Sequence, residues 1–175
     1  MKIAIIGDFH IPTRSPKIPE KINKKLKEES PELILCTGDL IQQNILKKLE
    51  KIAKTKTVKG NMDRITQPDS VQIQEQGTKI MMIHGDQVNP RGNKDQLRYI
   101  AQENRADILI HGHTHKLNID KINEKILINP GSATGAPSGG RTRSKPSFVT
   151  LKINEKITIK KIYEEKEEEE TYELN

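Results

Sequence analysis

The chain has 175 residues, of which 33% are hydrophobic and 3% aromatic, and its formal net charge is +6. This length is enough for one buried core and too short for two ordinary domains. No apolar run approaches the roughly 20 residues of a membrane-spanning helix, and the first residues already read as a strand, so we expect no leader segment and a cytoplasmic protein. Few aromatic residues and no nucleic-acid-binding motif argue against a platform for single-stranded nucleic acid.

Short apolar segments alternate with helical patterns through the first two thirds of the chain. The apolar segments run straight into Gly, Asp or His, as buried strands do when they end at a functional edge; they lie at 2–6, 33–36, 79–83 and 108–110. Between them, apolar residues recur at helical spacing, at 19–29, 43–53 and 94–104. This alternation predicts βαβ units.

The last third of the chain predicts an antiparallel sheet, because its β-rich segments are joined by Asn-Glu turns; they lie at 117–122, 126–128, 148–153 and 156–163. The stretch 137–145, rich in Gly, Ser and Arg, predicts an exposed, mobile loop, in which Arg141, Arg143 and Lys145 are candidate phosphate contacts by charge alone. We therefore expect an α/β fold in which two sheets pack face to face as a β-sandwich flanked by helices. Its four layers would have the order αββα, within a single domain at 1–163.

The end of the chain is strongly acidic, because residues 164–175 contain seven Glu and one Lys, a charge of -6 that leaves +12 on the remainder. Like charges cannot bury a core, so we expect a fraying helix or a disordered tail, and its deletion should leave the fold intact. The basic remainder favours anionic partners, although a general Lys bias on solvated faces gives the same charge. Cys36 is expected to be a small buried hydrophobe.

Five clusters of Asp, Asn and His lie where predicted strands end, at 7–10, 38–39, 60–63, 84–85 and 112–115. Loops at the carboxyl ends of strands in an α/β sheet converge on one crevice, so these side chains should meet. Residues two apart on extended backbone also point the same way, as in Asp8 with His10 and His113 with His115. The predicted metal ligands are Asp8, His10, Asp39, Asn61, His84, His113 and His115.

Imidazole nitrogen with carboxylate and amide oxygen suits divalent Mn, Zn, Fe, Co or Ni. Seven ligands exceed the need of one tetrahedral ion, whereas two ions about 3.5 to 4 Å apart that share one carboxylate account for the surplus. A lone buried His is ordinarily structural, yet every His of the chain lies in or beside a cluster. His111 is assigned to strand packing or to support of its neighbours.

In order and context, these clusters resemble the calcineurin-like metallophosphoesterases over nearly the whole chain. The small prokaryotic phosphodiesterases and the vacuolar protein sorting-associated protein 29 family, whose members are retromer subunits, are most similar. The resemblance implies one ion held by Asp8, His10, Asp39 and His115 and a second held by Asp39, Asn61, His84 and His113. Asp39 would be the bridge, Asp39, Asn61 and His84 the catalytic set, and a hydroxide shared by the two ions would attack phosphorus.

The implied function is a dinuclear metal-dependent phosphodiesterase acting on phosphate esters. Met62 stands where many members have a His that protonates the leaving group, a role worth about 10² to 10⁴ in rate. Its absence predicts slow turnover or substrates with good leaving groups; Asp63 could assist by supporting its neighbours. The alternative is a retromer-like trafficking scaffold with a protein partner and little or no catalysis. The polar stretch 89–92 lacks the apolar hot spot that such docking needs.

Overall fold

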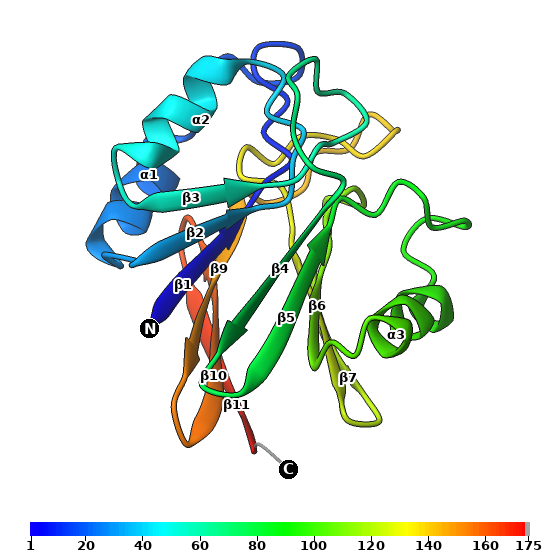
Figure 1. Ribbon diagram of the computed structural model, residues 1–175. Coiled ribbons are helices and arrows are strands. Elements are labelled where there is room, and N and C mark those ends of the chain that lie inside the picture. The colour runs from blue at the N-terminus through cyan, green and yellow to red at the C-terminus, as the bar shows by residue number, and fades with distance from the viewer. Residues whose placement is uncertain (174–175) are drawn as a thin grey trace.

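The computed structural model describes residues 1–173, which form two mixed β-sheets and three helices (Figure 1). The first sheet has the order β11 (Glu167–Glu173), β10 (Lys156–Tyr163), β9 (Ser147–Ile153), β1 (Lys2–Ile6), β2 (Leu33–Cys36) and β3 (Lys54–Thr57). The second has the order β4 (Ser70–Glu75), β5 (Thr78–Ile83), β6 (Ile108–Ile110), β8 (Lys125–Pro130) and β7 (Leu117–Ile122). Strands β1 to β3 are parallel, as are β5, β6 and β8, and the other pairs are antiparallel.

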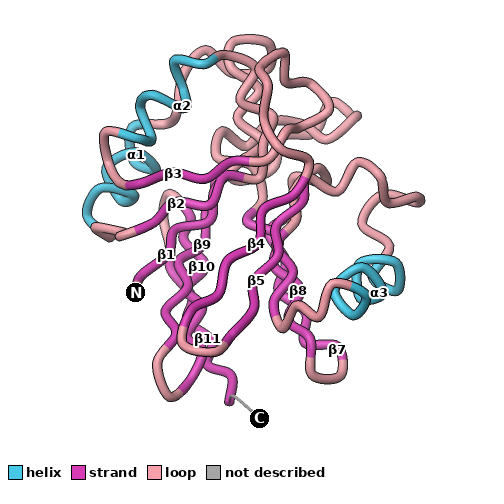
Figure 2. Tube along the Cα trace, viewed as in Figure 1, coloured by secondary structure: helices cyan, strands magenta, loops and turns pink. Residues whose placement is uncertain are grey.

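The helices cover the outer faces of the two sheets (Figure 2). Helices α1 (Glu20–Glu28) and α2 (Gln43–Glu50) pack on the first sheet, and α3 (Lys94–Glu103) packs on the second. All three begin and end within three residues of the predicted bounds. At the start of α3, Asn93 Oδ1 accepts a hydrogen bond of 3.0 Å from Gln96 N, a side-chain cap of the kind that Asn favours.

Alternation along the strands divides the interior into separate cores. In β1, Ile3 and Ile5 face the core between the sheets, whereas Ala4 and Ile6 face the core beneath α1 and α2. A third core lies between the second sheet and α3, where Leu97 packs with apolar strand residues. Because central strands are buried on both faces, they read as unbroken apolar runs, and the predicted four-layer αββα sandwich is confirmed.

The predicted antiparallel sheet in the last third of the chain is wrong as a single sheet. Strands β7 and β8 belong to the second sheet, and β9 to β11 extend the first. The prediction also omitted β3 and β4. Both are edge strands with many polar residues, and β4 alternates exposed with half-buried positions, so neither has the apolar run that marks a central strand.

The acidic segment is a strand over 167–173, so the expected fraying helix or disordered tail is wrong there; residues 174–175 lie outside the described residues. Strand β11 pairs with β10 along its whole length, where Lys156 lies 2.8 Å from Glu173 and Lys160 lies 2.7 Å from Glu167. Opposite charges on adjacent strands stabilise the pairing, and Tyr172 packs against the core between the sheets. None of the helices within 1–173 is long and apolar enough to cross a membrane.

Candidate metal centre

The loops that follow β1, β2, β3, β5 and β6 meet at one end of the sandwich, at the top of Figure 1. All seven predicted ligands lie on these loops, and hydrogen-bond and ion-pair distances link them into one group. The two parallel portions of the sheets therefore deliver side chains that are more than 100 residues apart in sequence to the same place.

The first part of this group contains Asp8, His10, Asp39 and His115, whose ligand atoms all lie within 4.8 Å of one another. Nε2 of His10 is 3.0 Å from Nε2 of His115 and 3.2 Å from Asp39 Oδ2. His115 Nε2 is also 3.5 Å from Asp8 Oδ1. The side chains of all four are buried, so these donors face one another rather than water.

The second part contains Asn61, His84 and His113. His84 Nε2 is 3.0 Å from Asn61 Oδ1 and 3.3 Å from His113 Nδ1. The same Nε2 is 3.6 Å from Asp39 Oδ2, the oxygen that also faces His10. The other oxygen, Asp39 Oδ1, accepts a hydrogen bond of 2.8 Å from Met62 N. One carboxylate oxygen thus faces both parts of the group, while its twin is held by the backbone.

Backbone carbonyls fix the tautomers of two of the imidazoles. His84 Nδ1 lies 2.7 Å from Thr37 O, and His115 Nδ1 lies 2.8 Å from Ala136 O. Because a carbonyl only accepts, both Nδ1 atoms carry the proton and both Nε2 atoms turn a lone pair toward the group. Such outer hydrogen bonds orient histidines for metal binding.

Burial keeps three of the imidazoles neutral, since it lowers the pKa of His10 to about 3 and the pKa values of His113 and His115 to about 4. Burial also raises the pKa of Asp8 to about 7 and shifts that of Asp39 upward. Neutral imidazoles and desolvated carboxylates converging on one space suit a divalent cation, which would compensate the buried negative charge. The residues present therefore fit a metal centre.

The backbone of these loops is strained. Five candidate ligands have φ between 47° and 68°: Asp8, His10, Asp39, His113 and His115. Residues other than Gly adopt this left-handed region at a cost in free energy. Such strain persists where the surrounding structure over-determines it, and it gathers at functional sites.

Two glycines of the clusters are required by close approach. A Cβ on Gly60 would lie 2.2 Å from Asp39 Oδ1, and one on Gly112 would lie 2.8 Å from Asp8 Oδ2. A side chain at either position would displace a candidate ligand. This explains why Gly recurs beside the Asp, Asn and His residues.

Asp63 accepts backbone hydrogen bonds from the two loops that carry Asp39 and Asn61. Its Oδ2 accepts hydrogen bonds of 2.9 Å from Asp39 N and from Gly60 N, and its Oδ1 accepts one of 2.7 Å from Ile41 N. Asp63 is 7% exposed, so these bonds are shielded from water. The carboxylate ties the loop after β2 to the loop after β3, which positions Asp39 relative to Asn61.

Sequence reasoning missed several residues that shape the rim. Arg14 donates a hydrogen bond of 2.8 Å to Pro137 O, and Arg91 donates one to His113 O; a charged residue within a few positions of each cluster was the available signal. Arg143, expected as a phosphate contact by charge alone, instead donates to Arg14 O at 3.2 Å and to Thr134 O at 2.9 Å. Arg143 therefore links the loop that carries Arg14 to the loop that carries Thr134.

Comparison with known proteins agrees with this geometry. The family model of the calcineurin-like phosphoesterase superfamily domain matches residues 1–156. A probable metallophosphoesterase of Methanothermobacter thermautotrophicus is 43% identical over 157 residues, covering 88% of this chain and 87% of its own. Another, of Methanocaldococcus jannaschii, is 36% identical over 162 residues, covering 93% and 81%.

Among solved structures, wild-type Vps29 of Entamoeba histolytica complexed with Zn²⁺ superimposes with a TM-score of 0.90. It is 35% identical, and the match covers 100% of both chains. The family match, the curated relatives and the shared fold agree with the Asp and His cluster described above. The chain belongs to the calcineurin-like phosphoesterase superfamily.

Proposed function

We propose that this protein is a phosphodiesterase that works with two divalent metal ions. The observation that carries the proposal is the position of Asp39 Oδ2, which lies 3.2 Å from His10 Nε2 and 3.6 Å from His84 Nε2. A carboxylate oxygen shared by two groups of ligands is the arrangement expected of a bridge between two ions. The ions would be Mn, Zn, Fe, Co or Ni, since the donors are imidazole nitrogens with carboxylate and amide oxygens.

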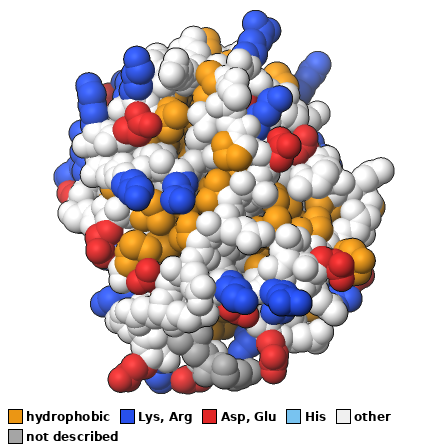
Figure 3. Space-filling model, in the orientation of Figure 1, with side chains coloured by type: hydrophobic (Ala, Val, Ile, Leu, Met, Phe, Trp, Pro, Cys, Tyr) orange, Lys and Arg blue, Asp and Glu red, His pale blue; other side chains and the backbone are white. Residues whose placement is uncertain are grey.

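When bound, a pair of such ions lowers the pKa of water and neutralises charge on phosphoryl oxygens. The protein's contribution is to hold the ligands in place: Ala136 O and Thr37 O orient His115 and His84, and Asp63 sets the loop that carries Asp39. Asp39, Asn61 and His84 would act directly at the reacting phosphate. Lys and Arg side chains project from the loops at this end of the molecule (Figure 3), and they favour an anionic substrate.

Met62 sets a limit on the reaction. Met62 is 40% exposed and occupies the position where the family pattern has a His that protonates the leaving group. A thioether cannot donate a proton. The enzyme should therefore prefer esters whose leaving groups need no protonation. The free, buried Cys36 suits a reducing compartment, and we propose the cytoplasm as the place of action.

The test is hydrolysis of an aryl phosphodiester by the Mn-loaded protein. Wild type should turn over only with metal, and Asp39→Asn should reduce the rate at least 100-fold, since an interaction realised at the reacting centre is typically worth about 10² or more. Asp95→Asn is the matched control, because Asp95 is an exposed residue of α3. Equal activity of Asp39→Asn and wild type would overturn the bridging role.

A second candidate function is a trafficking scaffold with a retromer-like protein partner, favoured by the match of the whole chain to Vps29. Under that hypothesis, the centre would bind metal without turnover. Absence of hydrolysis of every diester and monoester tried, by protein that contains its full complement of metal, would favour the scaffold. Isolation of a stable protein partner from the native cell would then be the next measurement.

A further inference from the structure

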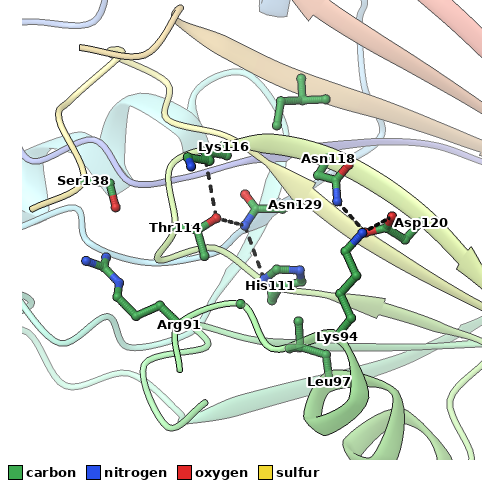
Figure 4. Close-up of a pocket in the computed structure, with 12 residues that line it drawn as sticks. Arg91, Lys94, Leu97, His111, Thr114, Lys116, Asn118, Asp120, Asn129 and Ser138 are labelled. Atoms are coloured by element: carbon green, nitrogen blue, oxygen red, sulfur yellow. Dashed lines mark hydrogen bonds and ion pairs between the residues drawn. The ribbon is translucent and has the colours of Figure 1, made fainter. Parts of the chain in front are cut away.

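A cavity of about 490 Å³ opens beside the candidate metal centre. Figure 4 shows it between the start of α3, the loop that carries Arg91, and strands β7 and β8. Its volume falls within the range of small-molecule sites. Nothing in the proposed reaction at the metal ions uses this space.

The cavity and the metal centre share one loop. Thr114 lines the cavity and lies between the candidate ligands His113 and His115 in sequence. Arg91, which also lines the cavity, donates a hydrogen bond to His113 O. The loop that carries two candidate metal ligands therefore also lines the cavity.

The floor of the cavity is built of buried polar side chains. His111 is 8% exposed and Asn129 is 1% exposed. Asn129 Oδ1 accepts a hydrogen bond of 2.9 Å from Gly131 N. Its Nδ2 therefore faces Gly112 O and Thr114 Oγ1, each at 2.9 Å, and lies 3.3 Å from His111 Nδ1. The other ring nitrogen, His111 Nε2, has no hydrogen-bond partner within 1–173, and the ring lines the cavity (Figure 4).

The walls add positive charge. Arg91, Lys94 and Lys116 line the cavity together with one acid, Asp120, so the lining has two more positive than negative charges. Asp120 is already paired, because Lys94 Nζ lies 2.7 Å from its Oδ1 and Asn118 donates to its Oδ2. Arg91 and Lys116 have no carboxylate partner within 1–173. Two cations without a carboxylate partner favour a group with negative charge and several acceptor oxygens.

We propose that this cavity binds a second phosphate group of the substrate, remote from the one that is hydrolysed. That this phosphate belongs to a substrate rests on the proposed phosphodiesterase, but the binding of phosphate itself does not depend on the metal ions. Without cations, the centre offers the acidic groups of Asp8 and Asp39 and neutral imidazoles, whereas the cavity keeps its positive side chains, so the cavity is the favoured site for phosphate in metal-free protein. Free inorganic phosphate and phosphate carried by an ester share this chemistry, and two experiments separate them.

The first experiment titrates inorganic phosphate into chelator-treated protein labelled with ¹⁵N-histidine. The His111 ring nitrogens should shift in a saturable manner, and Lys116→Gln should weaken phosphate binding about fivefold, the effect of losing one exposed charge contact. Lys121→Gln is the matched control, because Lys121 is an exposed residue of β7, the strand that begins directly after Lys116, and it lies outside the cavity. A His111 signal that phosphate does not move, or equal affinities of the two variants, would overturn the proposal.

The second experiment compares two substrates of the Mn-loaded protein, the nitrophenyl ester of thymidine 5′-phosphate with and without a 3′-phosphate. Wild type should have a KM about fivefold lower for the doubly phosphorylated ester, and Lys116→Gln should lose that difference with no change for the simpler ester. Equal KM values in wild type would overturn the assignment to substrate, even if free phosphate binds. Phosphate binding by the metal-free protein, together with no turnover of either ester by the Mn-loaded protein, would instead support the site while refuting the proposed function.

Discussion

Replacing Asp63 with Asn should destabilise the protein, although Asp63 is not a candidate ligand. Its carboxylate accepts three backbone hydrogen bonds, from Asp39 N, Gly60 N and Ile41 N, at 2.7 to 2.9 Å. An amide has the same shape but only one acceptor atom. If its oxygen keeps the two bonds now made by Oδ2, its NH₂ group must face Ile41 N, which is also a donor.

The magnitude follows from those three bonds. A hydrogen bond to a charged group is worth about 1.5 to 3 kcal/mol, and a buried donor left without a partner costs about 1 to 3 kcal/mol. Asp63→Asn loses one such bond outright and the charge assistance of the other two. Because these terms overlap in one network, we expect a loss of about 2 to 4 kcal/mol in the free energy of unfolding.

The assay is urea unfolding of metal-free protein, which separates the backbone effect from any metal affinity. Asp95→Asn is the control for an exposed Asp in the same chain, and it should change stability by less than about 0.5 kcal/mol. The half-saturating Mn concentration should rise in Asp63→Asn, because Asp39 and Asn61 are no longer tied to each other. A loss of stability below about 0.5 kcal/mol in Asp63→Asn would refute the bracing role of this carboxylate.

Three further predictions concern the acid, the pH response and the last strand. Met62→His should raise the rate for esters with poor leaving groups and leave good ones unchanged, measured as the dependence of rate on leaving-group pKa. In metal-free protein the pKa values of His10, His113 and His115 are about 3 to 4, below the ordinary 6.5, so between pH 6.5 and 4 the unfolded chain binds more protons and the free energy of unfolding should fall with falling pH. The raised pKa values of the buried carboxyls of Asp8 and Asp39 oppose this fall in stability, but they are fewer than the imidazoles with lowered pKa values, which include His111. A free energy of unfolding that rises on acidification, measured by urea unfolding, would contradict the prediction. Deleting 164–175 should lower Tm by a few degrees without changing metal stoichiometry, because β11 pairs along β10 far from the centre; an unchanged Tm would mean that this pairing contributes nothing.

The sequence predicted the fold wherever burial leaves a periodic signature. Ile3 to Ile6 alternate between two cores, so every one of these residues is apolar, and the helices show one apolar face each. Strand β11 has no such signature. Its pairing depends on lysines of β10 that are separated from it by a turn, and only the three-dimensional register shows that Lys156 and Lys160 meet Glu173 and Glu167.

The candidate site was predictable for a different reason. Asp, Asn and His placed directly after strands mark a shared crevice, so all seven ligand candidates could be chosen from local sequence. The cavity beside the site could not, because it depends on the hydrogen bonds of Asn129, which point an amide at His111. Neither residue is distinguishable from a packing residue until the backbone of β8 is placed next to β6.

The proposed function depends above all on one carboxylate oxygen of Asp39 serving two metal ions. Elemental analysis of protein loaded with Mn and freed of loosely bound ions tests this bridge, with a parallel measurement on Asp39→Asn. We predict two ions per chain in wild type and at most one in the variant, with both proteins folded. A saturating value of one ion in folded wild type would contradict the bridge.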